Sequence, residues 1–251
     1  MIVLATSFFL IAVRVLSMIL AAPVLGSRRI PLLFRLAGGL VISLVALPLV
    51  GIPTDTPDHW GGLISAVLSE AVIGSMFGLG VLIIYSAAQF VGTIVGQMAG
   101  LQVDAFSGAE TSGQSTTGRL FAMVSAAVFV LIGGPEMMIA SVLDSFQTLP
   151  VGSPVEPHNL LETCITLLQQ SFLLALKAVA PAMGALMVAT IVVGMLSRSL
   201  PQINILQVGL SSNLIVMMLA IFFTLGGCIW LFVDDLQSSI QYLQEALRNA
   251  A

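Results

Sequence analysis

The chain has 251 residues, of which 58% are hydrophobic and only 8% are charged, and its formal net charge at pH 7 is −4. Because a soluble domain carries roughly 25% charged residues, this composition excludes an ordinary water-soluble domain and predicts a membrane protein.

Six apolar runs follow one another along the chain. They cover residues 3–26, 36–53, 61–103, 120–143, 164–196 and 205–233. A helix needs roughly 20 apolar residues to cross the hydrocarbon core, so five of the runs match one span or slightly more. The third run is too long for one straight span, and we expect it to bend or to continue beyond the membrane. The predicted fold is therefore an all-α, polytopic membrane protein of about six long, partly broken helical segments.

The placement of arginines predicts how the chain is oriented. The first, third and fifth connections carry arginines, whereas the second (53–60) and the fourth (147–163) carry no Lys or Arg. The arginines concerned are Arg28, Arg29, Arg35, Arg119 and Arg198. The positive-inside rule then predicts that these three connections are cytoplasmic and that both termini lie outside. No basic residue precedes the first apolar run, so we interpret it as a retained helix and not as a cleaved signal peptide.

Spaced glycines mark the third apolar run. They are Gly74 and Gly78, followed by Gly92, Gly96 and Gly100. Small residues four apart form a flat groove on a helix, which lets another backbone approach closely. The neighbour is either another helix of the same chain or another subunit, and the sequence does not choose between them.

A polar loop follows the last of these glycines. The stretch LQVDAFSGAETSGQSTTGR leads from Gly100 to Arg119, and apolar sequence resumes at Leu120. Lipid cannot satisfy the backbone groups of such a loop, so it is buried by protein or lines an aqueous path. The residues that we single out in loop 104–118 are Asp104, Phe106, Ser107, Gly108, Glu110, Gly113 and Gly118. The loop therefore indicates a pore, a gate or a substrate path.

Three charged residues lie well inside apolar runs: Arg14, Glu70 and Lys177. A bare charge at the bilayer centre costs about 2.5–3.5 kcal/mol on insertion scales, so such residues face protein, water or each other. They could form a proton or ion relay. Alternatively, they form a charge pair that fixes helix register, or reach the interface with a long side chain. We favour the structural interpretation, because isolated charges of mixed sign make a poor relay, and we predict that Glu70 pairs with a basic group of this chain or of a partner.

No enzyme signature is present. The sequence lacks HExxH, CxxC, GxSxG and P-loop motifs, and we interpret Cys164 and Cys228 as packing residues of the apolar runs. We therefore expect no catalytic activity, no cofactor and no metal. Between the fifth and sixth runs, a hairpin turn is predicted from Arg198, Pro201, Gln202 and Asn204, and residues 234–248 are predicted to form a short amphipathic helix.

Taken together, these segments resemble the FliR/SctT family, the R (or T) subunit of the type III protein export gate. The matching positions are Arg14 with Pro23; Glu70 with Gly74 and Gly78; Gly92, Gly96, Gln97 and Gly100; the cluster from Gly118 to Phe121; Asp144 to Phe146 with Leu149 and Pro150; Ala180 with Pro181; and Ser197, Arg198 and Pro201 to Asn204. The segment after Gly209 departs from the family pattern, because Leu210 to Asn213 replace a proline followed by a basic residue.

The resemblance implies a core, non-enzymatic subunit of an export gate in the bacterial inner (cell) membrane, within the flagellar basal body. Its implied partners are P-type (FliP-like) and Q-type (FliQ-like) subunits, an FlhB-like switch protein, membrane lipid and the unfolded polypeptides that the gate exports, with no nucleic acid. Residues 1–160 correspond to a P-like part and 161–251 to a Q-like hairpin with the C-terminal tail. Loop 104–118 would plug the pore, and the exported polypeptides would be unfolded flagellar (or injectisome) proteins.

Two other functions fit the composition less well. A stand-alone secondary transporter or channel would show inverted repeats of similar length and intramembrane charges lining one cavity. The apolar runs are instead unequal and show no internal symmetry. An intramembrane enzyme is disfavoured by the missing catalytic motifs.

Overall fold

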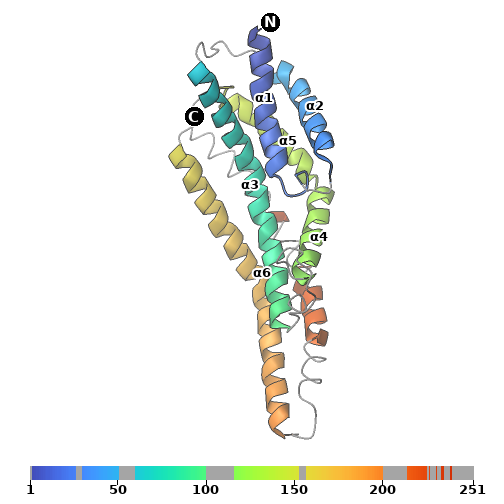
Figure 1. Cartoon of the computed structure of the whole chain (residues 1–251). Coiled ribbons are helices and arrows are strands. Elements are labelled where there is room, and N and C mark those ends of the chain that lie inside the picture. The colour runs from blue at the N-terminus through green and yellow to red at the C-terminus, as the bar shows by residue number, and fades with distance from the viewer. Residues whose placement is uncertain are drawn as a thin grey trace. The chain divides into compact units, whose positions relative to one another are not determined.

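The computed structural model describes residues 2–26, 30–50, 60–99, 116–152, 157–199 and 214–224, together with the single residues 226, 230, 233, 234 and 238. Its labelled helices are α1 (Ile2–Ala21), α2 (Leu32–Val50), α3 (Trp60–Met98), α4 (Thr116–Leu131), α5 (Gly134–Thr148) and α6 (Pro157–Ser199) (Figure 1). A further apolar helix covers Leu214–Thr224. The described residues contain no strand, which confirms the predicted all-α class.

Within the described residues, three helices are long and apolar enough to cross a membrane: Val3–Ala21, Gly61–Met98 and Glu162–Met195. The third apolar run forms a single 39-residue helix. At 1.5 Å per residue this helix is about 58 Å long, so it continues well beyond a hydrocarbon core of about 30 Å. The chain is therefore a polytopic helical membrane protein, as predicted.

The fourth apolar run is not the single straight span that its hydropathy suggests. It is divided between α4 and α5, which meet at an angle of 62°. Gly133 adopts a left-handed conformation (φ 76°), and Pro135 lies in the first turn of α5. A proline lacks the N–H that would continue the previous helix, while glycine tolerates positive φ, so this pair of residues ends α4 and starts α5. If the bent pair counts as one crossing, the described residues contain up to four helices that could span a membrane.

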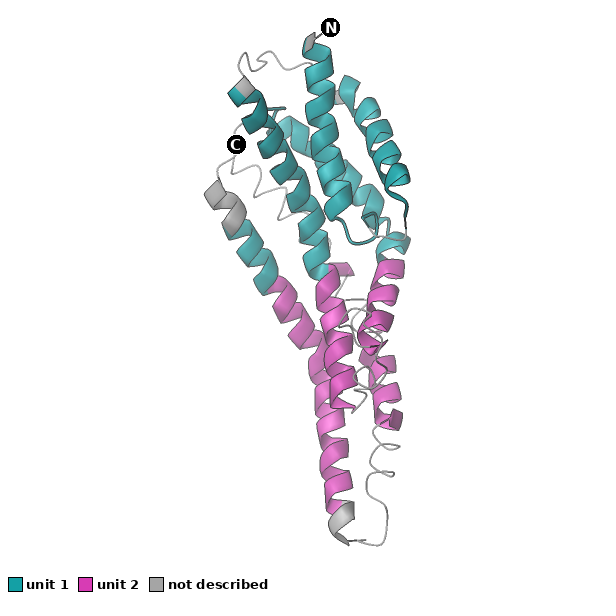
Figure 2. Ribbon diagram, in the orientation of Figure 1, with its two compact units in different colours: residues 1–84, 129–169, 236–251 teal, residues 85–128, 170–235 magenta. Residues whose placement is uncertain are grey.

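The described chain forms two compact units, coloured separately in Figure 2. Unit 1 comprises residues 1–84, 129–169 and 236–251, and unit 2 comprises residues 85–128 and 170–235. Each of the helices α3, α4 and α6 is divided between the two units, with one part in unit 1 and the other part in unit 2. This division follows spatial contacts, whereas the predicted boundary at residue 160 follows the family resemblance, so the P-like and Q-like parts stay a prediction.

Within unit 1, α1 packs against α2 and α5. The buried face of α1 includes Leu10, Ile11, Arg14, Val15 and Met18. These positions recur at intervals of three and four, which places them on one side of a helix. An arginine therefore lies in the middle of the face that α1 buries.

Helix α3 approaches α1 closely at its first two spaced glycines. A Cβ atom at Gly78 would lie 2.5 Å from Ala21 Cβ and 2.6 Å from the carbonyl oxygen of Met18, and one at Gly74 would clash with the carbonyl oxygen of Arg14. Only glycine permits this separation of the two backbones. The neighbour of this glycine pair is thus a helix of the same chain.

Helix α5 has a polar exposed face. Its buried residues are Gly134, Met138, Ser141, Val142, Ser145 and Phe146. Its exposed residues are Glu136, Ala140, Asp144, Gln147 and Thr148, none of which is a large hydrophobic residue. Hydrocarbon cannot solvate this face.

We expect Gly74→Ala to destabilise the protein by about 1–3 kcal/mol, because the added methyl group meets a main-chain oxygen that cannot move aside. The matched control is Gly61→Ala on the same helix, where an added Cβ meets nothing within 4 Å. There the higher helix propensity of alanine should leave the stability unchanged or improved. Thermal unfolding of the purified chains in detergent measures both, and equal melting temperatures would contradict the close contact.

Candidate functional site

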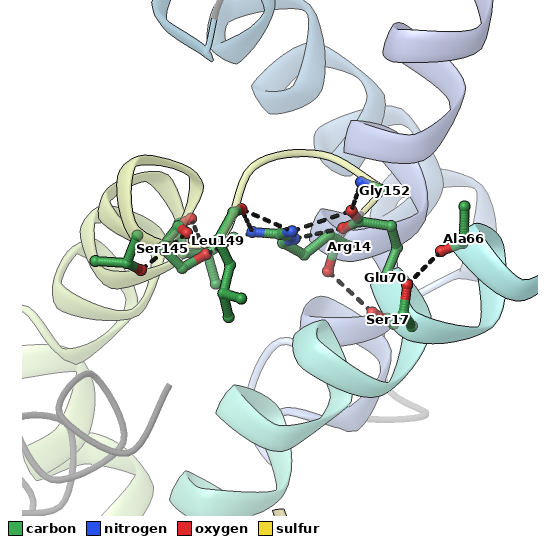
Figure 3. Close-up of polar contacts among 10 residues, drawn as sticks. Arg14, Ser17, Ala66, Glu70, Ser145, Leu149 and Gly152 are labelled. Carbon is green, nitrogen blue, oxygen red and sulfur yellow. Dashed lines mark hydrogen bonds and ion pairs between the residues drawn. The ribbon is translucent and has the colours of Figure 1, made fainter. Parts of the chain in front are cut away.

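The most elaborate polar cluster of unit 1 surrounds Arg14 and Glu70 (Figure 3). Both side chains are completely buried. Arg14 Nε donates a hydrogen bond to Glu70 Oε2, and Nη2 donates one to Oε1 at 3.0 Å. The pair is therefore bidentate, the geometry in which a guanidinium binds a carboxylate most strongly. The prediction that Glu70 pairs with a basic group is confirmed, and the group belongs to the same chain.

The remaining donors of Arg14 bind the C-terminal end of α5. Nη1 donates to Ser145 Oγ at 3.1 Å and to the carbonyl oxygen of Leu149 at 3.2 Å, and Nη2 donates to the same carbonyl at 3.2 Å. A guanidinium has five N–H donors, and each of them finds an acceptor here. The guanidinium carbon also lies 4.1 Å from the centroid of the Phe146 ring, within the range of a cation–π contact.

Glu70 extends the cluster in the other direction. Its Oε1 accepts a hydrogen bond from the backbone N–H of Gly152 at 2.8 Å. Ser145 Oγ itself donates to the carbonyl oxygen of Val142 at 2.6 Å. The cluster thus joins α1, α3, the end of α5 and the turn that follows α5 through residues far apart in sequence.

This geometry supports a structural role for the pair. A proton or ion relay needs groups that exchange protons with water, whereas here both charges are out of contact with solvent and every Arg14 donor is occupied. The positive charge of Arg14 and the negative charge of Glu70 compensate each other, and removing either residue leaves the other charge buried and uncompensated. The cluster therefore fixes the register of three helices.

Lys177 does not join this cluster. It lies on α6 within unit 2, and its side chain is exposed. The structure thus brings two of the three predicted intramembrane charges together and leaves the third on an open face of its helix.

The second group of spaced glycines belongs to unit 2 and packs on α4. A Cβ at Gly92 would lie 2.6 Å from the carbonyl oxygen of Thr117 and 2.7 Å from Phe121 Cδ2, and a Cβ at Gly96 would clash with Thr117 Oγ1. The end of α3 and the start of α4 therefore form a tight stem, which holds the two ends of the polar loop together. Here too the close neighbour is a helix of the same chain.

Most of the predicted loop residues lie outside the described residues: Asp104, Phe106, Ser107, Gly108, Glu110 and Gly113. The same holds for Gly100 and for Pro201, Gln202 and Asn204 of the predicted hairpin turn. Two boundaries need correction. Gly118 is not a loop residue but a buried position in the first turn of α4, which begins at Thr116. Arg198 lies in the last turn of α6, which continues to Ser199, and not in the turn itself.

Two features of the site were missed by sequence reasoning. The carbonyl of Leu149 and the N–H of Gly152 are main-chain groups, which every residue carries, so no residue type marks them. The polar face of α5 does have a signal, because Glu136, Ala140 and Asp144 recur every fourth residue after Gly133–Gly134–Pro135. The high mean hydropathy of the fourth apolar run made this spacing of small and acidic residues difficult to recognise.

Comparisons with known proteins are consistent with this membrane architecture. The family model for bacterial export proteins, family 1, matches residues 5–239. The chain is 28% identical to the flagellar biosynthetic protein FliR of Buchnera aphidicola subsp. Acyrthosiphon pisum (strain APS), over 89% of this chain and 86% of the relative. It is 25% identical to FliR of Escherichia coli (strain K12), over 83% and 80% of the two chains. It is also 26% identical to the surface presentation of antigens protein SpaR of Shigella sonnei, over 78% and 73%.

We expect Glu70→Ala to destabilise the protein by about 3–5 kcal/mol, because it leaves Arg14 buried without its counter-charge. The control is Glu162→Ala, since Glu162 is exposed on α6. The double variant Arg14→Met/Glu70→Leu should recover much of the loss, because it removes both charges together. Thermal unfolding in detergent measures all three, and a Glu70→Ala chain as stable as the control would contradict the structural role.

Proposed function

The chain belongs to family 1 of the bacterial export proteins, and on that premise we propose that it is a core membrane subunit of the type III protein export gate. The single observation that carries the proposal is the family match over residues 5–239. Relatives named FliR and SpaR support an export-apparatus role, and the FliR relatives favour flagellar proteins as the exported substrates.

We propose that the gate assembles from this chain together with P-type and Q-type subunits and an FlhB-like switch protein in the bacterial inner membrane, at the flagellar basal body. Three apolar helices long enough to span a bilayer support the membrane location. Residues 1–160 would supply the P-like part and 161–251 the Q-like hairpin. The chain would catalyse no reaction, so energy for export would come from its partners or from the membrane gradient.

Within this gate, the polar loop between α3 and α4 would plug the pore. The stem formed by Gly92 and Gly96 against Thr117 supports this role, because it fixes both ends of the loop at one place. The loop sequence offers Gly, Ser and Thr and one aromatic residue, Phe106, so it presents many hydrogen-bonding groups and few apolar contacts. Displacing such a segment requires little free energy.

Native mass spectrometry of the tagged chain, purified from its own membranes in mild detergent, tests the proposed function. We expect one copy of this chain with several copies of two smaller membrane proteins. A monomer or a homo-oligomer without other subunits would overturn the proposal and favour a stand-alone transporter.

Deleting residues 107–113 should make the closed assembly leaky to small ions, because the plug then no longer fills the lumen. Conductance of the reconstituted complex in planar bilayers measures the leak, with the undeleted complex as reference. A second variant replaces the same residues by an equally long Gly-Ser segment and should restore part of the seal. Unchanged ion conductance in the deletion variant would refute the plug.

A further inference from the structure

Among the three membrane-length helices of the described residues, α6 has the smallest buried share. Only 22% of the most apolar stretch within Glu162–Met195 is buried, compared with 44% for α1 and 50% for α3. Large apolar side chains are exposed along most of its length, among them Ile165, Phe172, Leu173, Met187 and Ile191. The other described residues leave this surface exposed, and we compare two possible covers, lipid and another subunit.

Lys177 lies in the middle of the exposed stretch. It follows Glu162 by 15 residues and precedes Met195 by 18 residues. Because a straight crossing takes about 20 residues, every such stretch within Glu162–Met195 contains Lys177. Its side chain is exposed, and its neighbours Leu173 and Leu176 on the same helix are 54% and 42% exposed.

Lipid is a poor cover for this face. Lysine can reach the headgroups only when the membrane boundary lies within about one helical turn of it. A boundary on one side of Lys177 would leave Met187, Ile191 and Met195 in water, and a boundary on the other side would leave Ile165, Leu168 and Phe172 in water. Apolar surface on both sides thus holds Lys177 at depth, where a bare ammonium is strongly disfavoured.

The buried carboxylate of unit 1 already has its own hydrogen-bond partners, so it is not free to pair with Lys177. Glu70, the acidic residue among the three charges that lie well inside apolar runs, is bound by Arg14 and by the N–H of Gly152. Unit 1 shows the arrangement that suits a charge at this depth, which is a buried pair with an opposite charge on a neighbouring helix.

We propose that the Lys177 face of α6 docks against a membrane helix of another subunit, and that this helix carries an aspartate or glutamate at the depth of Lys177. The inference rests on the proposed function, because it needs a multi-subunit gate. Charge complementarity selects the partner. An apolar helix with one carboxylate would pair with the Lys177 ammonium and would also cover the exposed apolar side chains of α6. The pair would also set the register of α6 against that helix.

Photocrosslinking of the assembled complex tests the contact directly. A photoreactive amino acid replaces Leu173 or Leu176 in turn, while Lys177 is kept, and mass spectrometry identifies the crosslinked peptide. We expect both positions to crosslink to a membrane helix of a different subunit that contains Asp or Glu. Crosslinks to lipid alone, or to a helix without a carboxylate, would overturn the inference.

Charge variants provide the second measurement. Lys177→Met keeps the apolar stem and removes the charge, so co-purification of the contacting subunit should fall about tenfold or more. Lys177→Arg should retain the subunit, and Lys177→Glu combined with a lysine at the identified carboxylate should restore it. Full retention of the subunit by Lys177→Met and Lys177→Glu would refute the pair while leaving the proposed function intact. Loss of all partner subunits from the unaltered chain would instead refute the proposed function.

Discussion

The fold of unit 1 depends on a single desolvated ion pair. Arg14 and Glu70 are both completely buried, so in the folded protein each charge is strongly destabilised if the other is removed. Since the guanidinium also binds Ser145 and the carbonyl of Leu149, the requirement extends to the end of α5. A shift of α1 by one residue would leave several polar groups unpaired. The cluster therefore selects one arrangement of α1, α3 and α5 among the many that apolar helices could adopt.

Glycines make that arrangement possible. Gly74 and Gly78 let α3 approach α1 closely enough for Glu70 to reach Arg14, because they lie one and two turns further along the same helix. In unit 2, Gly92 and Gly96 allow the same kind of close packing between α3 and α4. One helix thus carries two glycine pairs with different partners, and the second pair defines where the proposed plug is attached.

Sequence reasoning reached the helical class, the family and the pairing of Glu70, because hydropathy, motif spacing and the cost of an isolated charge are properties of residue type. It left open which helices the glycines face, since a small side chain permits a contact without specifying it. It also missed the break at Gly133 and the roles of Leu149 and Gly152. The break was concealed by apolar residues on both sides, and the other two act through main-chain atoms. The plug loop and the hairpin turn after Ser199 lie outside the described residues and stay predictions from sequence and resemblance.

The wide separation of the cluster in sequence has a consequence for biogenesis. Glu70 follows Arg14 by 56 residues, and Ser145 follows it by 131. During synthesis the first span must therefore enter the membrane with its guanidinium unpaired, at a cost of about 2.5–3.5 kcal/mol that the surrounding apolar residues offset. Helix α1 can be inserted at that stage, but its register against α3 and α5 is not yet fixed. The register is fixed only after the ribosome has produced the turn that follows α5, so more than half of the protein is made before then.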